Sequence, residues 1–71
     1  MKTVRFENPP LSFNPKILII EKLAKAKYKI ISDGLELGVL LVRDGYWILT
    51  PNDILITEDD KEFLIIAAKE L

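Results

Sequence analysis

Two kinds of hydrophobic pattern divide the chain into a helical part and a β-rich part. Residues 3–7 alternate between polar and apolar side chains, as a short edge strand does, and the prolines at residues 9–10 end the pattern. Between residues 15 and 27 apolar side chains recur at helical spacing, with lysines on the opposite side. Asn14 can accept hydrogen bonds from free amides, and Pro15 is tolerated at a first helical position. We therefore predict a helix over residues 15–27.

From residue 28 onward the apolar positions form short runs that are separated by turn residues, which is typical of β-strands. The predicted strands cover residues 28–31, 35–43, 46–50 and 62–67. Together with the first strand and the helix they give the order β-α-β-β-β-β. We therefore expect a single small domain over residues 1–71, an α+β fold in which one helix packs on a small, mostly antiparallel sheet.

The hairpin between residues 38 and 51 supports the most detailed prediction. Asp44 and Gly45 lie between two apolar runs, and this pair favours a type I′ turn, which needs positive φ at both central positions. A turn of two residues places Arg43 opposite Tyr46 and fixes the pairing of the residues that follow. One face then carries Leu40, Val42, Trp47 and Leu49. The other face carries Val39, Leu41, Arg43, Tyr46 and Ile48.

Both faces of this hairpin are largely apolar, whereas a solvated antiparallel face has a polar residue at every second position. Hydrophobic residues make up 49% of the sequence, which is more than a chain of 71 residues buries easily. The predicted last strand, with its run from Phe63 to Ile66, also lacks polar alternation. One helix covers only one face of a sheet, so we expect the other face to meet a second copy of the chain. The predicted dimer interface consists of Val39, Leu41, Ile48, Phe63 and Ile65.

The composition narrows the chemistry that is available to the chain. It contains no cysteine and no histidine, and therefore lacks thiols, disulfides, the commonest general base and the commonest zinc ligand. Its three glycines are dispersed and form no phosphate-binding loop. The acidic run Glu58–Asp60 lacks the alternating ligand spacing of a calcium loop, and we interpret it as a solvated turn. We expect no enzymatic activity, no catalytic residues, no metal and no cofactor.

The absence of a long apolar segment is relevant to the cellular location of the protein. No segment approaches the roughly 20 apolar residues of a membrane span, and no signal-peptide pattern follows Met1. With the lack of cysteine, this predicts a protein of the reducing cytoplasm that is not inserted in a membrane.

The charges suggest a second interpretation. The net charge of −1 divides into +5 over residues 1–30 and −6 over residues 31–71, and such halves can attract each other or a second copy. The lysines of the predicted helix also fit a small protein that binds nucleic acid through this helix. We rank nucleic-acid binding second, because lysines are ordinary surface residues of helices. A structural interaction protein without a small ligand is a third interpretation.

The segment Gly38–Pro51 resembles the middle of the TrkA-C domain, which is also called RCK-C. That family has an apolar strand that reaches an Arg, a tight turn near a Gly, an often aromatic strand and then a Pro. Further conserved features of the family have counterparts at Asp53, Ile56, Asp60 and the run Leu64–Ile66. The resemblance covers the 29 residues from Gly38 to Ile66.

The resemblance implies a dimeric cytoplasmic module that regulates potassium channels, transporters or related proteins. In such modules small anionic ligands lie between the two copies, and the resemblance suggests Arg43 as an anion contact. Next to Tyr46 at the hairpin tip, the guanidinium can also stack on the aromatic ring. We therefore expect a non-enzymatic regulatory and ligand-binding module that acts as a homodimer, with Arg43 and Tyr46 as ligand-binding residues. A small anionic ligand and a membrane transport protein are its candidate partners.

Overall fold

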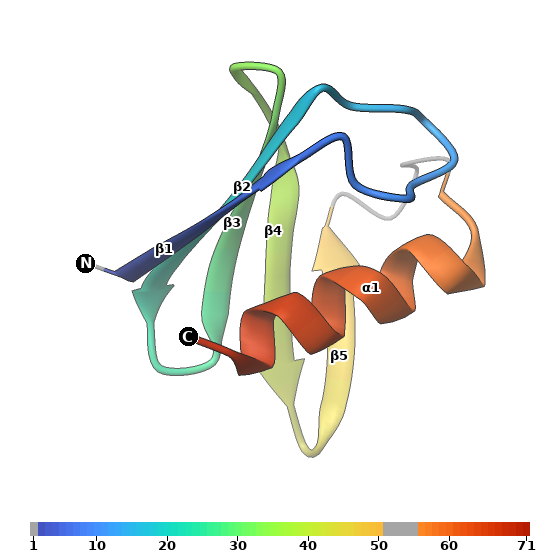
Figure 1. The fold of residues 1–71 in the computed structure, drawn as a ribbon. Helices are drawn as coiled ribbons and strands as arrows, with labels where there is room; N and C mark the ends of the chain where they lie inside the picture. Colours follow the sequence, from blue (N-terminus) through green and yellow to red (C-terminus); the bar gives the residue numbers. More distant parts are fainter. Residues whose placement is uncertain (1, 51–55) are drawn as a thin grey trace.

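The computed structural model describes residues 2–50 and 56–71. Within them five strands form one antiparallel sheet, and a helix follows the strands (Figure 1). The strands are β1 (Lys2–Glu7), β2 (Ile17–Ala24), β3 (Lys27–Ser32), β4 (Leu35–Arg43) and β5 (Tyr46–Thr50), and the helix is α1 (Glu58–Lys69). Each strand pairs with the next one along the chain, so the sheet order is β1-β2-β3-β4-β5.

The observed order, β-β-β-β-β-α, corrects the predicted order β-α-β-β-β-β. Two predicted elements are wrong. The segment 15–27, expected as a helix, contains β2 and the turn after it, and the segment 62–67, expected as a strand, belongs to α1. The other predicted strands are confirmed, because they lie within β1, β3, β4 and β5.

β2 is a strand whose two faces are both apolar. Leu18 and Ile20 are fully buried on one face, while Ile17 and Ile19 are partly exposed on the other. Four consecutive apolar residues fit a helical pattern and a two-faced strand equally well, so periodicity alone could not separate them. Asn14 does not cap a helix, because its φ of 49° places it in the left-handed region just before β2.

α1 begins with a capping box. The hydroxyl of Thr57 accepts a hydrogen bond from the N–H of Asp60, and the carboxylate of Asp60 accepts one from the N–H of Thr57. Two donors at the helix start are thereby satisfied. The first turn carries three acidic residues and the last turn carries Lys69, which complements the helix dipole. The run Glu58–Asp60 is therefore the start of a helix instead of the solvated turn that we predicted.

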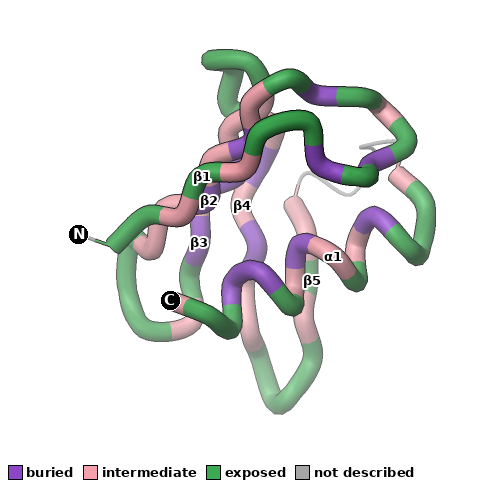
Figure 2. Tube along the Cα trace, in the orientation of Figure 1, coloured by how far each residue is buried: buried purple, intermediate pink, exposed green. Residues whose placement is uncertain are grey.

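The core lies between α1 and one face of the sheet, which we call the inner face (Figures 1 and 2). Its fully buried large side chains are Leu18, Ile20, Ile30, Leu40 and Leu64. Phe6 meets Phe63 of α1 edge to face, with 5.2 Å between the ring centroids. Tyr28 stacks on Trp47, with 5.7 Å between the centroids. The helix therefore closes the inner face across the width of the sheet, from β1 to β5.

The predicted register of the β4–β5 hairpin is confirmed. Arg43 pairs with Tyr46, and the pairing continues in the predicted order to Leu40 and Leu49. The turn residues Asp44 and Gly45 have φ of 52° and 81°, the positive values that a type I′ turn requires. The inner face of the hairpin holds Leu40, Val42, Trp47 and Leu49, as predicted.

The β2–β3 turn contains a strained residue. Ala26 has a φ of 73°, a conformation that is about 1–2 kcal/mol unfavourable for a residue with a Cβ atom. Its carbonyl oxygen accepts a hydrogen bond from the N–H of Val42 at 3.0 Å. This bond to β4 holds the turn in its strained conformation.

Ala26→Gly is expected to stabilise the fold by about 1 kcal/mol, because glycine adopts this φ without a steric clash. Thermal unfolding followed by circular dichroism should show a midpoint about 4–8 °C higher in a domain of this size. Ala24→Gly, at the end of β2, is the matched control and should lower stability by about 0.5–1 kcal/mol, because the unfolded chain gains entropy. If both substitutions destabilise equally, Ala26 is not strained.

Candidate binding surfaces

The face of the sheet opposite α1, here called the outer face, carries a set of partly exposed apolar side chains. They come from four strands and are Ile17, Ile19, Ile31, Val39, Leu41 and Ile48. Ile19 lies opposite Ile31 in the ladder, and Leu41 lies opposite Ile48. Since α1 packs on the inner face (Figure 1), no helix within residues 2–50 and 56–71 covers these side chains.

The register divides the six apolar residues into two groups that lie diagonally across the outer face from each other. Ile17, Ile19 and Ile31 lie on β2 and β3, toward the β3–β4 turn. Val39, Leu41 and Ile48 lie on β4 and β5, and continue toward the β4–β5 turn.

Charged residues lie between these two groups. Glu21 is opposite Lys29, and the ammonium of Lys29 lies 3.7 Å from the carboxylate of Glu36. Lys27 is opposite Leu41 and has no ion-pair partner within the described residues. The outer face therefore carries two apolar groups with charged residues along the diagonal between them.

The five residues of the predicted dimer interface do not share one surface. Val39, Leu41 and Ile48 are neighbours on the outer face. Phe63 and Ile65 lie on α1, on the other side of the sheet, where Phe63 packs into the core. The separation follows from the helical structure of the segment that we predicted as a strand.

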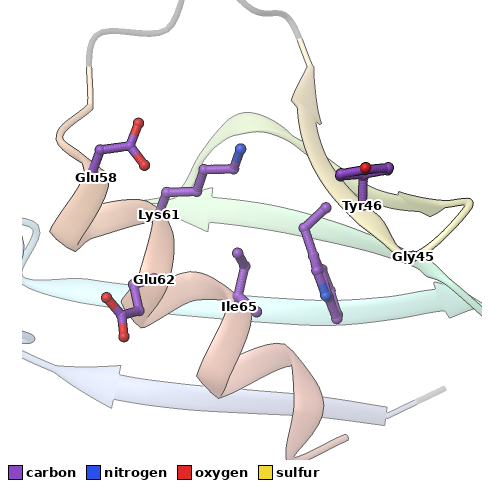
Figure 3. A pocket seen from close by; sticks show the side chains of 7 residues that line it. Gly45, Tyr46, Glu58, Lys61, Glu62 and Ile65 are labelled. Atoms are coloured by element: carbon purple, nitrogen blue, oxygen red, sulfur yellow. The ribbon is translucent and has the colours of Figure 1, made fainter.

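A groove lies between the start of β5 and the first turns of α1 (Figure 3). Its volume is about 380 Å³. Gly45, Tyr46 and Trp47 line the sheet side. The helix side is lined by Glu58, Lys61, Glu62 and Ile65, whose spacing of three and four residues puts them on one face of α1.

Of the two predicted ligand-binding residues, Tyr46 lines this groove and Arg43 does not. Tyr46 is 73% exposed, and the exposed Arg43 lies opposite it in the ladder. In Figure 3 the side chain of Lys61 extends from α1 into the space between helix and strand. Sequence reasoning missed Lys61 and the rest of the helix wall, because it did not place this segment beside β5.

The nucleic-acid interpretation depended on a lysine-rich helix, and this predicted helix is wrong because the segment forms β2 and β3. Lys22, Lys25, Lys27 and Lys29 lie on the β2–β3 hairpin. The ammonium of Lys22 lies 6.0 Å from the centroid of the Tyr28 ring, toward the inner face, whereas Lys27 and Lys29 point to the outer face. These lysines therefore do not form one continuous helical face.

A buried carboxylate holds the start of α1 against the β1–β2 loop. Asp60 is 2% exposed and accepts hydrogen bonds from the N–H of Ser12 at 2.8 Å, from the hydroxyl of Ser12 and from the N–H of Thr57 at 3.1 Å. Burial by itself raises the pKa of a carboxyl group. The hydrogen bonds from Ser12 and Thr57 outweigh this effect and hold the pKa of Asp60 below its ordinary value of 3.8. The position of the helix wall therefore depends on an ionised carboxylate.

No protein family, curated protein or solved structure matches this chain. No helix of the described residues is long and apolar enough to cross a membrane. In residues 2–50 and 56–71 no three His, Cys, Asp or Glu side chains are grouped as metal ligands.

The resemblance to TrkA-C stays a prediction. The hairpin that carries it is present, but the run Leu64–Ile66, where the resemblance implied a strand, is helical. Asp53, another residue of the resemblance, lies outside the described residues.

Asp60→Asn is expected to lower the free energy of unfolding at neutral pH by about 1–3 kcal/mol, because a neutral amide in this buried position cannot accept all the hydrogen bonds that Ser12 and Thr57 donate to the carboxylate. Urea unfolding measures this change. Asp59→Asn, at the exposed neighbouring position, is the matched control and should change stability by no more than about 0.5 kcal/mol.

The pH dependence of this effect has a definite sign. The pKa of Asp60 is lower in the folded chain than in the unfolded chain, so its ionised form stabilises the fold above about pH 4. This contribution is lost as the pH falls through the folded-state pKa. The difference in unfolding free energy between wild type and Asp60→Asn should therefore shrink as the pH falls below about 4. A difference that stays constant with pH would contradict a role for the ionised carboxylate.

Proposed function

We propose that this chain is a non-enzymatic, ligand-binding regulatory module of the cytoplasm that acts as a homodimer through the outer face of its sheet. The observation that carries the proposal is the set of six partly exposed apolar side chains on that face. A sheet face in contact with water is polar at alternate positions. An apolar surface with charged residues around it is typical of a protein interaction site.

The layout of the outer face fits a second copy of the same face. A dimer axis that runs diagonally across the strands exchanges the two apolar groups, so that each group packs on the other group of the partner. Strands of the two sheets then cross near a right angle, which is one of the two common ways in which sheets pack. In this arrangement Ile19 packs on the partner's Leu41, and Ile31 packs on the partner's Val39.

The same arrangement joins opposite charges. Lys27 comes to lie against the partner's Glu21, and the two-fold symmetry makes this contact twice. Lys27 has no ion-pair partner within its own described residues. Charge complementarity therefore favours a second copy over an unrelated apolar partner.

The regulatory part of the proposal depends on the resemblance of Gly38–Ile66 to TrkA-C. Under it, a small anionic ligand stabilises one arrangement of the dimer and so changes the state of a bound transport protein. Arg43 and Tyr46 are the proposed contacts of that ligand. They support this role because they lie side by side next to the β4–β5 turn, and a guanidinium binds anions well.

Ile48→Lys is expected to convert the dimer to a monomer at high micromolar concentration, because it places a charge in an apolar contact. Sedimentation velocity should show dimerisation weakened at least about tenfold, equivalent to about 1.4 kcal/mol. Ile66→Lys, on the exposed side of α1, is the matched control and should leave the dimer intact. The exposed fractions of the two side chains are similar, 39% for Ile48 and 54% for Ile66. A wild-type chain that is monomeric at this concentration would rule out the proposal.

A charge exchange tests the diagonal arrangement. Lys27→Glu and Glu21→Lys each bring like charges together across the interface, and each should weaken the dimer. The double variant restores opposite charges and should recover most of the wild-type association, as measured by sedimentation equilibrium. If the double variant loses as much association as the two single variants combined, these residues do not meet.

A further inference from the structure

The two edges of the sheet differ in how they are protected from pairing with another strand. β1 carries Lys2, Arg5 and Glu7, and charged side chains on an edge strand oppose pairing with a further strand. β5, at the other edge, has the sequence Tyr-Trp-Ile-Leu-Thr and carries no charge. Its residues all favour or tolerate β-structure, so β5 is the edge that can accept an added strand.

The hairpin register determines which backbone groups of β5 face outward. A two-residue turn makes Arg43 and Tyr46 a hydrogen-bonded pair, and such pairs alternate with non-bonded pairs along the ladder. Trp47 and Leu49 fall in the non-bonded pairs, so their N–H and C=O groups point away from β4. Within the described residues no backbone hydrogen bond reaches these groups.

Trp47, whose backbone groups are free, lines the groove between β5 and α1. Alternate side chains of a strand laid along β5 would point toward α1, because side chains alternate across a sheet. Trp47 and Ile65 offer apolar contacts there. The charged side chains of the helix wall are Glu58, Lys61 and Glu62, which together carry a net negative charge.

We propose that β5 and the first turns of α1 bind an extended peptide segment of another protein, which adds a strand to the sheet. The peptide main chain bonds to Trp47 and Leu49, and its alternate side chains, apolar and basic, enter the groove. Peptides that bind in this way gain affinity from backbone hydrogen bonds and specificity from alternate side chains. The site uses an edge and the inner side of the sheet, so it does not depend on a dimer formed through the outer face.

The test uses two blocked synthetic peptides, one of three Val-Lys repeats and one of three Val-Glu repeats. Each is titrated into the 15N-labelled chain while amide shifts are recorded by NMR. The Val-Lys peptide is expected to shift the amides of Trp47 and Leu49 and to bind at least about tenfold more tightly than the Val-Glu peptide. The proposal is overturned if neither peptide shifts these amides, or if the largest shifts lie along β1.

Variants separate the two kinds of contact. Leu49→Pro removes an outward N–H without removing a bond to β4, because proline is tolerated on the free side of an edge strand. It should weaken binding of the Val-Lys peptide. If Leu49→Pro does not fold, Glu62→Lys still tests the site, since it should weaken Val-Lys binding and strengthen Val-Glu binding. Glu70→Lys, at the C-terminal cap of α1, is its matched control and should change neither.

Two further outcomes separate this proposal from the dimer. Lys27→Glu changes the outer face and should leave peptide binding unchanged, whether or not the chain forms a dimer. If the amides of Trp47 and Leu49 shift with protein concentration in the absence of peptide while those of Ile19 and Ile31 on the outer face do not, β5 pairs with a second copy, and the peptide proposal is overturned.

Discussion

A sheet has two faces, and this chain provides one helix of 12 residues to cover them within its described residues. Because one helix covers only one face, it determines where the core lies and which apolar residues stay exposed. α1 packs on the inner face, and the fully buried large side chains lie between the helix and β2, β3 and β4. The apolar residues of the outer face remain partly exposed, and in our proposal a second copy of the chain completes their burial.

The helix is held over the sheet by polar contacts as well as by apolar packing. Asp60 accepts hydrogen bonds from Ser12, in the β1–β2 loop, and from Thr57, at the helix cap. A buried carboxylate is tolerable when such donors replace water. The same side chain thus starts the helix and joins it to a segment 48 positions away in the sequence.

The sequence predicts the β4–β5 hairpin down to its register, because the geometry of the turn at Asp44 and Gly45 is a local property. It misplaces β2 and α1 because four apolar residues in a row, at Ile17–Ile20 and again at Phe63–Ile66, are compatible with either type of element. The capping box from Thr57 to Asp60 was the available local signal for the helix, and it outweighs the β propensity of the apolar run.

The sequence places the candidate surface residues together only where it also predicts their secondary structure correctly. Val39, Leu41 and Ile48 lie on the correctly predicted hairpin and are found on one face. Their counterparts at Ile17 and Ile19 were missed, because that segment was expected to be a helix. The groove was missed because it requires α1 to lie beside β5, a tertiary contact that no local pattern reports.

The sheet order β1-β2-β3-β4-β5 also has a consequence for the order in which the chain folds. Every strand pairs with its neighbour in sequence, so the ladders consist of local contacts that form quickly and can grow one hairpin at a time. α1, which covers the inner face, is synthesised last, because it follows all five strands in the sequence. During synthesis on the ribosome, a nascent sheet therefore has both faces open to solvent until residues 58–69 have emerged.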